Sequence, residues 1–86
     1  MVDQLRLART YHLPPKLCGM LLLLLEKETV TADMIEHDHQ FATCAKVGMW
    51  RLRRRLKPHK IEIKAMTNVG YWLEQKTKDQ IIEAVA

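Results

Sequence analysis

This chain of 86 residues has little of what marks several classes of protein. Its three glycines and three prolines are too few for a collagen-like or low-complexity chain. Its two cysteines, Cys18 and Cys44, lack CxxC spacing, and a chain this small that depends on disulfides usually contains more of them. We therefore expect two free thiols and a reducing compartment, the cytoplasm.

Long apolar runs are also missing. The longest covers residues 20–25, far short of the roughly 20 residues that a membrane-spanning helix needs. The first ten residues include Asp3, Arg6 and Arg9 and contain no apolar segment of a secretory signal. We expect no membrane contact. A chain of this length supports one modest core, which disfavours a multi-step enzyme.

The first third of the sequence predicts two helices separated by Pro14-Pro15. Residues 2–11 suit a short helix with Val2 and Leu5 facing inward, joined by Leu7 or Ala8. Pro15 suits the first position of a second helix, which extends to about residue 27, because the N–H that proline lacks has no partner there. One buried face of this second helix follows from the helical spacing of Leu17, Met20, Leu21 and Leu24.

Two further helices and a hairpin follow. Thr31 is the expected N-cap of a helix over residues 32–37, and a longer helix over residues 43–56 should end before Pro58. Alternation over residues 61–66, turn residues at 67–70 and an apolar segment at 71–73 predict a β-hairpin.

A capping box at Thr77 to Gln80 predicts the last helix, with Ile81, Ile82 and Val85 on one side. That helix either completes the core or forms the seam of a dimer. The predicted fold is mainly α with a C-terminal β-hairpin, in a single small domain over residues 1–86. Residues 1–12 are an N-terminal extension, residues 13–73 the body and residues 74–86 the C-terminal helix.

The charge is unevenly distributed. The net charge of +4 is mild, yet no Asp or Glu lies between His39 and Ile61. This stretch carries +7 and the rest of the chain −3, which is the distribution expected of a protein that binds a polyanion. The seven cations of the stretch are Lys46, Arg51, Arg53, Arg54, Arg55, Lys57 and Lys60.

The basic helix is expected to be amphipathic. At about 100° per residue, an inward apolar stripe is formed by Ala45, Met49, Leu52 and Leu56. The opposite side is formed by Thr43, Val47, Trp50 and Arg54, with Lys46, Arg51 and Arg53 on the flanks. A merely solvated face usually mixes both signs of charge, whereas this one lacks acids. Trp50 either meets a partner, sugar–phosphate or the hairpin, or packs against the preceding short helix.

Several segments look familiar together. VGMWRLRRRL (residues 47–56) and IEIKAMTNVGYWL (residues 61–73) resemble the end of the OmpR/PhoB-type DNA-binding domain of bacterial response regulators. Leu13-Pro14-Pro15-Lys16 with the leucines after it resembles the first core helix of that family, and Val30-Thr31 matches its short second helix. The resemblance covers about residues 13–73 and implies a winged helix-turn-helix.

In that family the third helix enters the major groove and a hairpin wing approaches the minor groove. The resemblance therefore implies that DNA is contacted by Thr43, Lys46, Val47, Trp50, Arg51 and Arg54, with Arg53, Lys57 and Lys60 on phosphates. Thr67 of the wing is a further expected DNA contact, at a position where the family often has Arg, and the helix has Gly48 where a larger polar residue is common. Without the family's N-terminal sheet and receiver domain, a stand-alone bacterial or phage regulator is expected.

Other chemistry finds little support in the residues. Glu36-His37-Asp38-His39 with Cys44 matches no standard zinc spacing, and no catalytic constellation or cofactor motif is visible. The expected function is sequence-specific binding of double-stranded DNA by a small transcriptional regulator, with a homodimer as one arrangement. The alternative is a protein-interaction module that docks on RNA polymerase or another regulator, suggested by outward-facing Trp50 and the apolar C-terminal helix.

Overall fold

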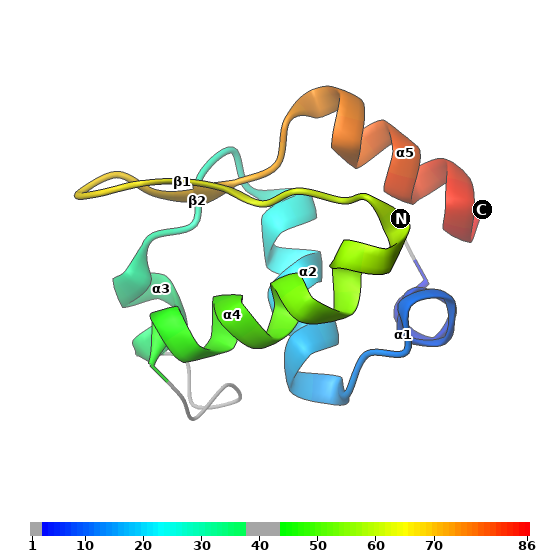
Figure 1. Ribbon diagram of the computed structural model, residues 1–86, viewed down its shortest axis with the longest axis horizontal. Helices are drawn as coiled ribbons and strands as arrows, with labels where there is room; N and C mark the ends of the chain where they lie inside the picture. Colours follow the sequence, from blue (N-terminus) through cyan, green and yellow to red (C-terminus); the bar gives the residue numbers. More distant parts are fainter. Residues whose placement is uncertain (1–2, 38–43) are drawn as a thin grey trace.

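The computed structural model describes residues 3–37 and 44–86, and it confirms a mainly helical fold with one antiparallel hairpin near the C-terminus (Figure 1). The hairpin projects from one end of the molecule, and α5 and α1 lie at the other end. In chain order the elements are α1 (Gln4–Tyr11), α2 (Pro15–Glu26), α3 (Ala32–Glu36), α4 (Ala45–Leu56), the 3₁₀ turn η1 (Lys57–His59), β1 (Lys64–Met66), β2 (Gly70–Trp72) and α5 (Gln75–Val85).

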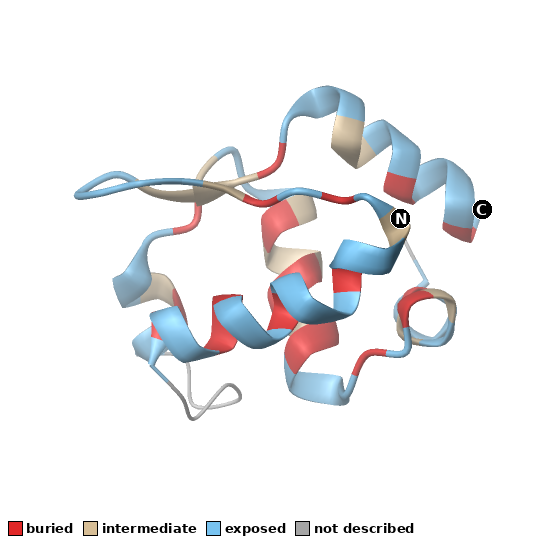
Figure 2. Cartoon of the chain, in the orientation of Figure 1, coloured by how far each residue is buried: buried red, intermediate tan, exposed pale blue. Residues whose placement is uncertain are grey.

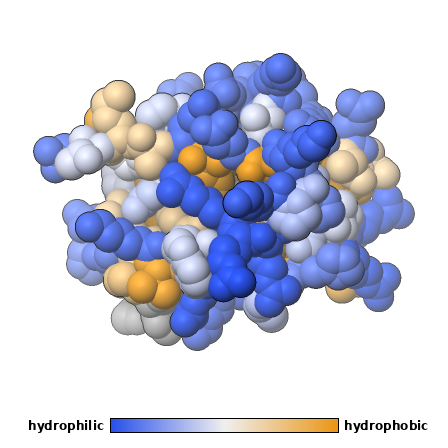
Figure 3. All heavy atoms as spheres, viewed as in Figure 1, coloured by the Kyte–Doolittle hydropathy of each residue, from blue (hydrophilic) through white to orange (hydrophobic). Residues whose placement is uncertain are grey.

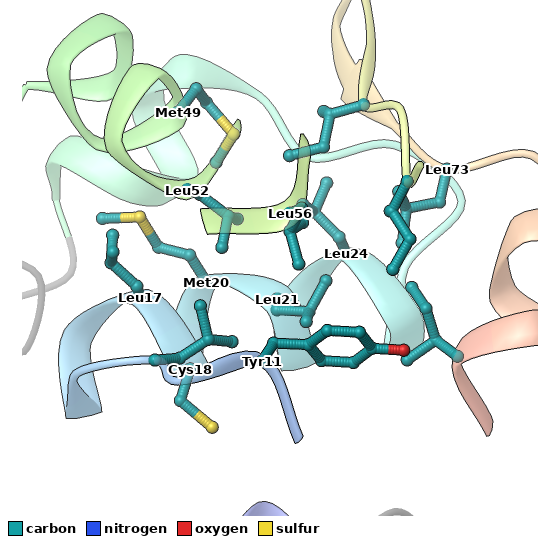
Figure 4. Packing of buried hydrophobic residues seen from close by; sticks show 14 of the residues in the cluster. Tyr11, Leu17, Cys18, Met20, Leu21, Leu24, Met49, Leu52, Leu56 and Leu73 are labelled. Atoms are coloured by element: carbon teal, nitrogen blue, oxygen red, sulfur yellow. The ribbon is translucent and has the colours of Figure 1, made fainter. Parts of the chain in front are cut away.

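Helix α2 is the centre of the core. Pro15 is its first residue, as predicted, and both α1 and α4 pack against it. The predicted inner face is buried, and further leucines (Leu22, Leu23 and Leu25) are half-buried against the same cluster. Figure 4 shows the packing of this cluster, in which Met49, Leu52 and Leu56 of α4 lie over α2. The prediction of the α2 face is therefore confirmed.

Helix α1 buries a different face from the one predicted. Asp3 caps the helix by accepting a hydrogen bond of 2.9 Å from the Leu5 amide. With the helix starting there, Leu7 and Tyr11, one turn apart, are buried, whereas Leu5 is 58% exposed. The prediction that Leu5 faces inward is wrong, and Val2 lies outside the described residues. The Tyr11 and His59 rings pack in a T-shaped arrangement, with 4.7 Å between their centroids, and so join α1 to η1.

Both cysteines are free thiols, as expected, but their surroundings differ. Cys18 is buried in α2 and its Sγ donates to the Gln4 carbonyl at 3.4 Å, whereas Cys44 is exposed before α4. Removal from water disfavours an ionised group, so burial raises the pKa of the Cys18 thiol and that of the Tyr11 phenol. Cys18 is therefore a packing residue of the core.

The amphipathic pattern of the basic helix is confirmed. Figure 2 shows buried positions on the inner side of α4 and exposed positions on its outer side. The predicted stripe is buried throughout, with Ala45, Met49, Leu52 and Leu56 each no more than 1% exposed.

The predicted N-cap of the short helix α3 is also confirmed. The Thr31 hydroxyl caps α3 by accepting a hydrogen bond from the Met34 amide at 3.2 Å.

The hairpin is shorter than predicted. β1 pairs with β2 so that Lys64 lies opposite Trp72 and Met66 opposite Gly70. The first strand begins at residue 64 and not at 61, because the register pairs only residues 64–66 with residues 70–72. Ile61 and Ile63 still alternate inward and are buried, so the period of two reflects burial there and not strand pairing.

A single bridge fixes the base of the hairpin to the body. Val30, which lies between α2 and α3, exchanges two backbone hydrogen bonds with Tyr71, of 2.7 and 2.8 Å. The neighbouring Gly70 has φ +133°, and a Cβ there would lie 2.5 Å from the Val30 carbonyl oxygen. Glycine therefore permits this close approach, which a larger residue would block.

The last helix begins earlier than the capping box predicts. Glu74 is the N-cap of α5, and Thr77 is half-buried within its first turn, so Thr77 is not the cap. Because Leu73 is buried, the chain is anchored directly before the helix. Ile81 and Val85 join the core, which α5 therefore helps to complete, whereas Ile82 is 45% exposed and does not share their side.

Candidate nucleic-acid interface

The outer face of α4 brings together five of the ten predicted contact residues. The predicted contact residues on this face are all exposed: Lys46, Val47, Trp50, Arg51 and Arg54. In Figure 3, hydrophilic side chains crowd the middle of the molecular face over α4. Thr43, the remaining residue predicted for this helix face, lies outside the described residues.

Trp50 and Arg54 form a pair on this face. They are one helical turn apart, and the Arg54 guanidinium carbon lies 4.9 Å from the centroid of a Trp50 ring. A cation over an indole face is attracted by the negative face of the ring system. Trp50 remains 57% exposed, so more than half of its surface is left uncovered. The pair presents an aromatic surface and a positive charge together.

Arg53 has a role that the sequence did not reveal. Its Nη2 donates a 2.9 Å hydrogen bond to the carbonyl of Ile63, in the segment ahead of the hairpin. This bond gives that carbonyl a partner where the sheet has not yet begun. The side chain predicted as a phosphate contact therefore first joins α4 to the hairpin, with its other N–H groups still available for a phosphate.

Arg55, which the prediction left out, acts in the same way on the other flank of α4. Its Nη1 donates a 3.0 Å hydrogen bond to the carbonyl of His12, in the connection between α1 and α2. Arg53 and Arg55 thus attach α4 on its two sides, one to the hairpin segment and one to the α1–α2 connection. The outer face between them carries Trp50 and Arg54.

The start of α4 is capped from another helix. The Oε2 of Glu36, the last residue of α3, accepts a 2.9 Å hydrogen bond from the Ala45 amide. A carboxylate at this end of a helix also interacts favourably with the helix dipole. Glu36 belongs to the acidic and histidine cluster considered for metal binding. Among residues 3–37 and 44–86, no three His, Cys, Asp or Glu side chains gather as metal ligands, and Asp38 and His39 lie outside those ranges.

No carboxylate of residues 3–37 or 44–86 forms an ion pair with the cations of α4 and η1. Within the described part of the chain, ion pairs involve only Lys64, which lies 3.3 Å from Glu62 and 3.8 Å from Glu74. Lys57 and Lys60 continue the basic surface beyond α4, and both are exposed. Unpaired charge concentrated on one element leaves a strong positive potential at this surface.

Thr67 lies apart from the α4 face. It occupies the exposed turn between β1 and β2, at the projecting tip of the hairpin (Figure 1). Its neighbours Met66 and Val69 are 59% and 45% exposed. The predicted contact residues therefore form two groups, a large one on α4 and η1 and a small one at the hairpin tip.

Within residues 3–37 and 44–86, no helix is both long enough and apolar enough to cross a membrane. No protein-family model, curated protein or solved structure matches the chain. Any proposal of function therefore has to rest on the chain's own residues and their arrangement.

Proposed function

We propose that the chain is a winged helix-turn-helix domain of the OmpR/PhoB type that binds double-stranded DNA sequence-specifically and regulates transcription. The observation that carries the proposal is the outer face of α4, where Trp50, Arg51 and Arg54 are exposed and neither arginine pairs with a carboxylate of residues 3–37 or 44–86. As a regulator of bacterial or phage origin, it would act in the cytoplasm.

The order of elements supports this fold. A core helix (α2), a bridged residue (Val30), a short helix (α3), the basic helix (α4) and a hairpin follow one another along the chain. Helices α3 and α4 pack against each other, as the two helices of a helix-turn-helix do. The hairpin, pinned at Tyr71 beside Val30, would be the wing.

The dimensions of α4 suit the major groove. Its 12 residues correspond to a length of about 18 Å at the usual helical rise. A groove about 12 Å wide admits one helix, and there Arg51 and Arg54 would read guanine edges and Val47 a thymine methyl. Lys57 and Lys60 would contact backbone phosphates and orient the domain, with Thr67 near the minor groove or backbone.

The decisive experiment is the selection of bound duplexes from a random pool at two salt concentrations. We expect an enriched motif and a steep loss of affinity with salt, because each phosphate that the protein neutralises releases counterions. A repeated motif would reveal a dimer through its half-site spacing. Failure to bind any duplex at low salt would overturn the proposal.

Two substitutions separate reading from positioning. Arg54→Ala should reduce discrimination at one base pair by about 1–3 kcal/mol, because a bidentate contact is lost. Lys57→Ala should weaken every sequence alike. Lys76→Ala removes another exposed cation, from α5, and serves as the control, with unchanged binding expected. Binding constants for matched and mismatched duplexes give all three results.

A second candidate, a protein-interaction module, is favoured by exposed apolar side chains outside the hairpin. Trp50, Leu5 and Ile82 are 57%, 58% and 45% exposed. If this function is the correct one, RNA polymerase or another regulator should be retained after nuclease treatment and at high salt. A partner held only through DNA would instead be lost under both conditions, because nuclease digests the DNA and high salt weakens its binding.

A further inference from the structure

A groove separates the start of α2 from the outer part of α4. Its volume is about 980 Å³. One wall includes Lys16 and Met20 of α2, and the other includes Gly48, Arg51 and Arg55 of α4. The groove therefore adjoins the outer α4 face on the flank that carries Arg55.

The chemistry of the groove is apolar at the bottom and positive at the edges. Met20 and Gly48 are buried, and Pro14 and Pro15 add apolar surface without a charge. Lys16 is exposed and, like the arginines opposite, has no carboxylate within ion-pair distance in the described residues. The lining contains no Asp or Glu among those residues, so the groove suits a ligand with apolar parts and negative charge.

The position of the groove decides between ligands of that kind. Arg53 is bonded toward the hairpin and Arg55 toward the α1–α2 connection, so the hairpin and the groove lie on opposite flanks of α4. A helix in the major groove is bordered by two sugar–phosphate strands, one on each flank. A strand on the flank away from the hairpin would meet this groove.

We propose that the groove between α2 and α4 receives the sugar–phosphate backbone of the DNA strand that borders the major groove on the side away from the hairpin. Lys16 and Arg55 neutralise phosphates from opposite walls, and the exposed Pro14 and Pro15 lie against the deoxyribose. The inference rests on the proposed function and adds Lys16 to the interface. In this arrangement, one DNA strand contacts the body of the domain at the groove, and the other strand lies on the side of the hairpin.

The test compares three lysine variants on one mixed-sequence 20-base-pair duplex. Lys16→Ala should lower the magnitude of the slope of log affinity against log salt by about 0.9, the value for one phosphate contact. Lys16→Arg should keep the slope of the wild type, because the charge remains. Lys76→Ala, which removes a cation from α5, should keep it as well. Thermal unfolding of each variant shows whether the fold is unchanged.

The outcomes distinguish this inference from the function on which it rests. If the wild type binds the duplex and Lys16→Ala has the same slope as Lys76→Ala, the groove assignment is wrong and DNA binding stands. If the wild type binds no duplex, both fail. Tighter binding of an octaglutamate peptide than of the duplex, lost in Lys16→Ala, would assign the groove to an acidic protein partner and overturn the inference.

Discussion

Helices α2 and α4 have the same length, 12 residues each, and opposite relations to their surroundings. The charged residues of α2 are Lys16 and Glu26 near its ends, and its leucines are buried or half-buried around most of its circumference. Helix α4 buries one stripe and exposes cations on the rest of its surface. One helix therefore organises the core, whereas the other is supported by the core and keeps its charged surface exposed.

Helix α4 is held by more than its apolar stripe. Glu36 caps its start, Arg53 bonds to the hairpin segment and Arg55 bonds to the α1–α2 connection. These three contacts orient the helix without using the outer face. Substitutions at Val47, Trp50 or Arg54 should therefore affect recognition more than folding.

The largest expected effect on stability comes from comparing a core residue of α2 with a residue on the outer face of α4. Leu24 of α2 is fully buried, so Leu24→Ala should lower the free energy of unfolding by about 2–5 kcal/mol through lost packing and a cavity. Val47→Ala on the exposed side of α4 should change it by less than about 0.5 kcal/mol. Chemical denaturation measures both. Equal losses would show that the two helices share the same structural role.

The cap on α4 gives the next effect. Glu36→Ala removes the acceptor of the Ala45 amide, and loss of a helix cap costs about 0.5–2 kcal/mol. Glu28→Ala, which removes another exposed carboxylate, is the control and should leave stability unchanged. The free energy of unfolding is compared in denaturant. If the two variants unfold alike, the contact from α3 does not stabilise α4.

The smallest effect distinguishes two adjacent arginines of α4. Arg53→Ala loses its bond to Ile63 and should destabilise the fold by about 0.5–1.5 kcal/mol, as for one hydrogen bond. Arg54→Ala uncovers Trp50 and should change stability by less than about 0.5 kcal/mol. Denaturation midpoints give the comparison. The reverse order would mean that the pair on the outer face, and not the bond to Ile63, stabilises α4.

The periodic parts of the chain were predictable. The buried faces of α2 and α4 follow from apolar residues repeated over three turns, and Pro15 and Thr31 mark helix starts through local chemistry. The eight-residue helix α1 is too short for periodicity to choose between Leu5 and Leu7. Where a strand begins or ends depends on which backbone segment lies opposite it, and that is set by the tertiary fold. The residues around Ile61 therefore do not determine locally where β1 begins.

The contacts that position the candidate site were not predictable in this way. Arg55 reaches a carbonyl 43 residues away, and Arg53 and Glu36 reach partners 10 and 9 residues away. No spacing rule connects such pairs, because their proximity follows from the tertiary fold. An arginine that holds the helix and one that faces outward look the same in the sequence, so Arg53 and Arg54 received similar predicted roles and Arg55 received none.

The bridge between Val30 and Tyr71 divides the hairpin into two parts with different freedom to change. At its base, the hairpin is tied to the body by the two hydrogen bonds between Tyr71 and Val30, and any larger side chain at Gly70 would strike the Val30 carbonyl. Toward the tip, residues 65–69 are exposed and take no part in the core. An exposed tip of this kind tolerates insertion and replacement. The reach of the hairpin can thus lengthen or shorten over evolutionary time while the rest of the domain keeps its shape.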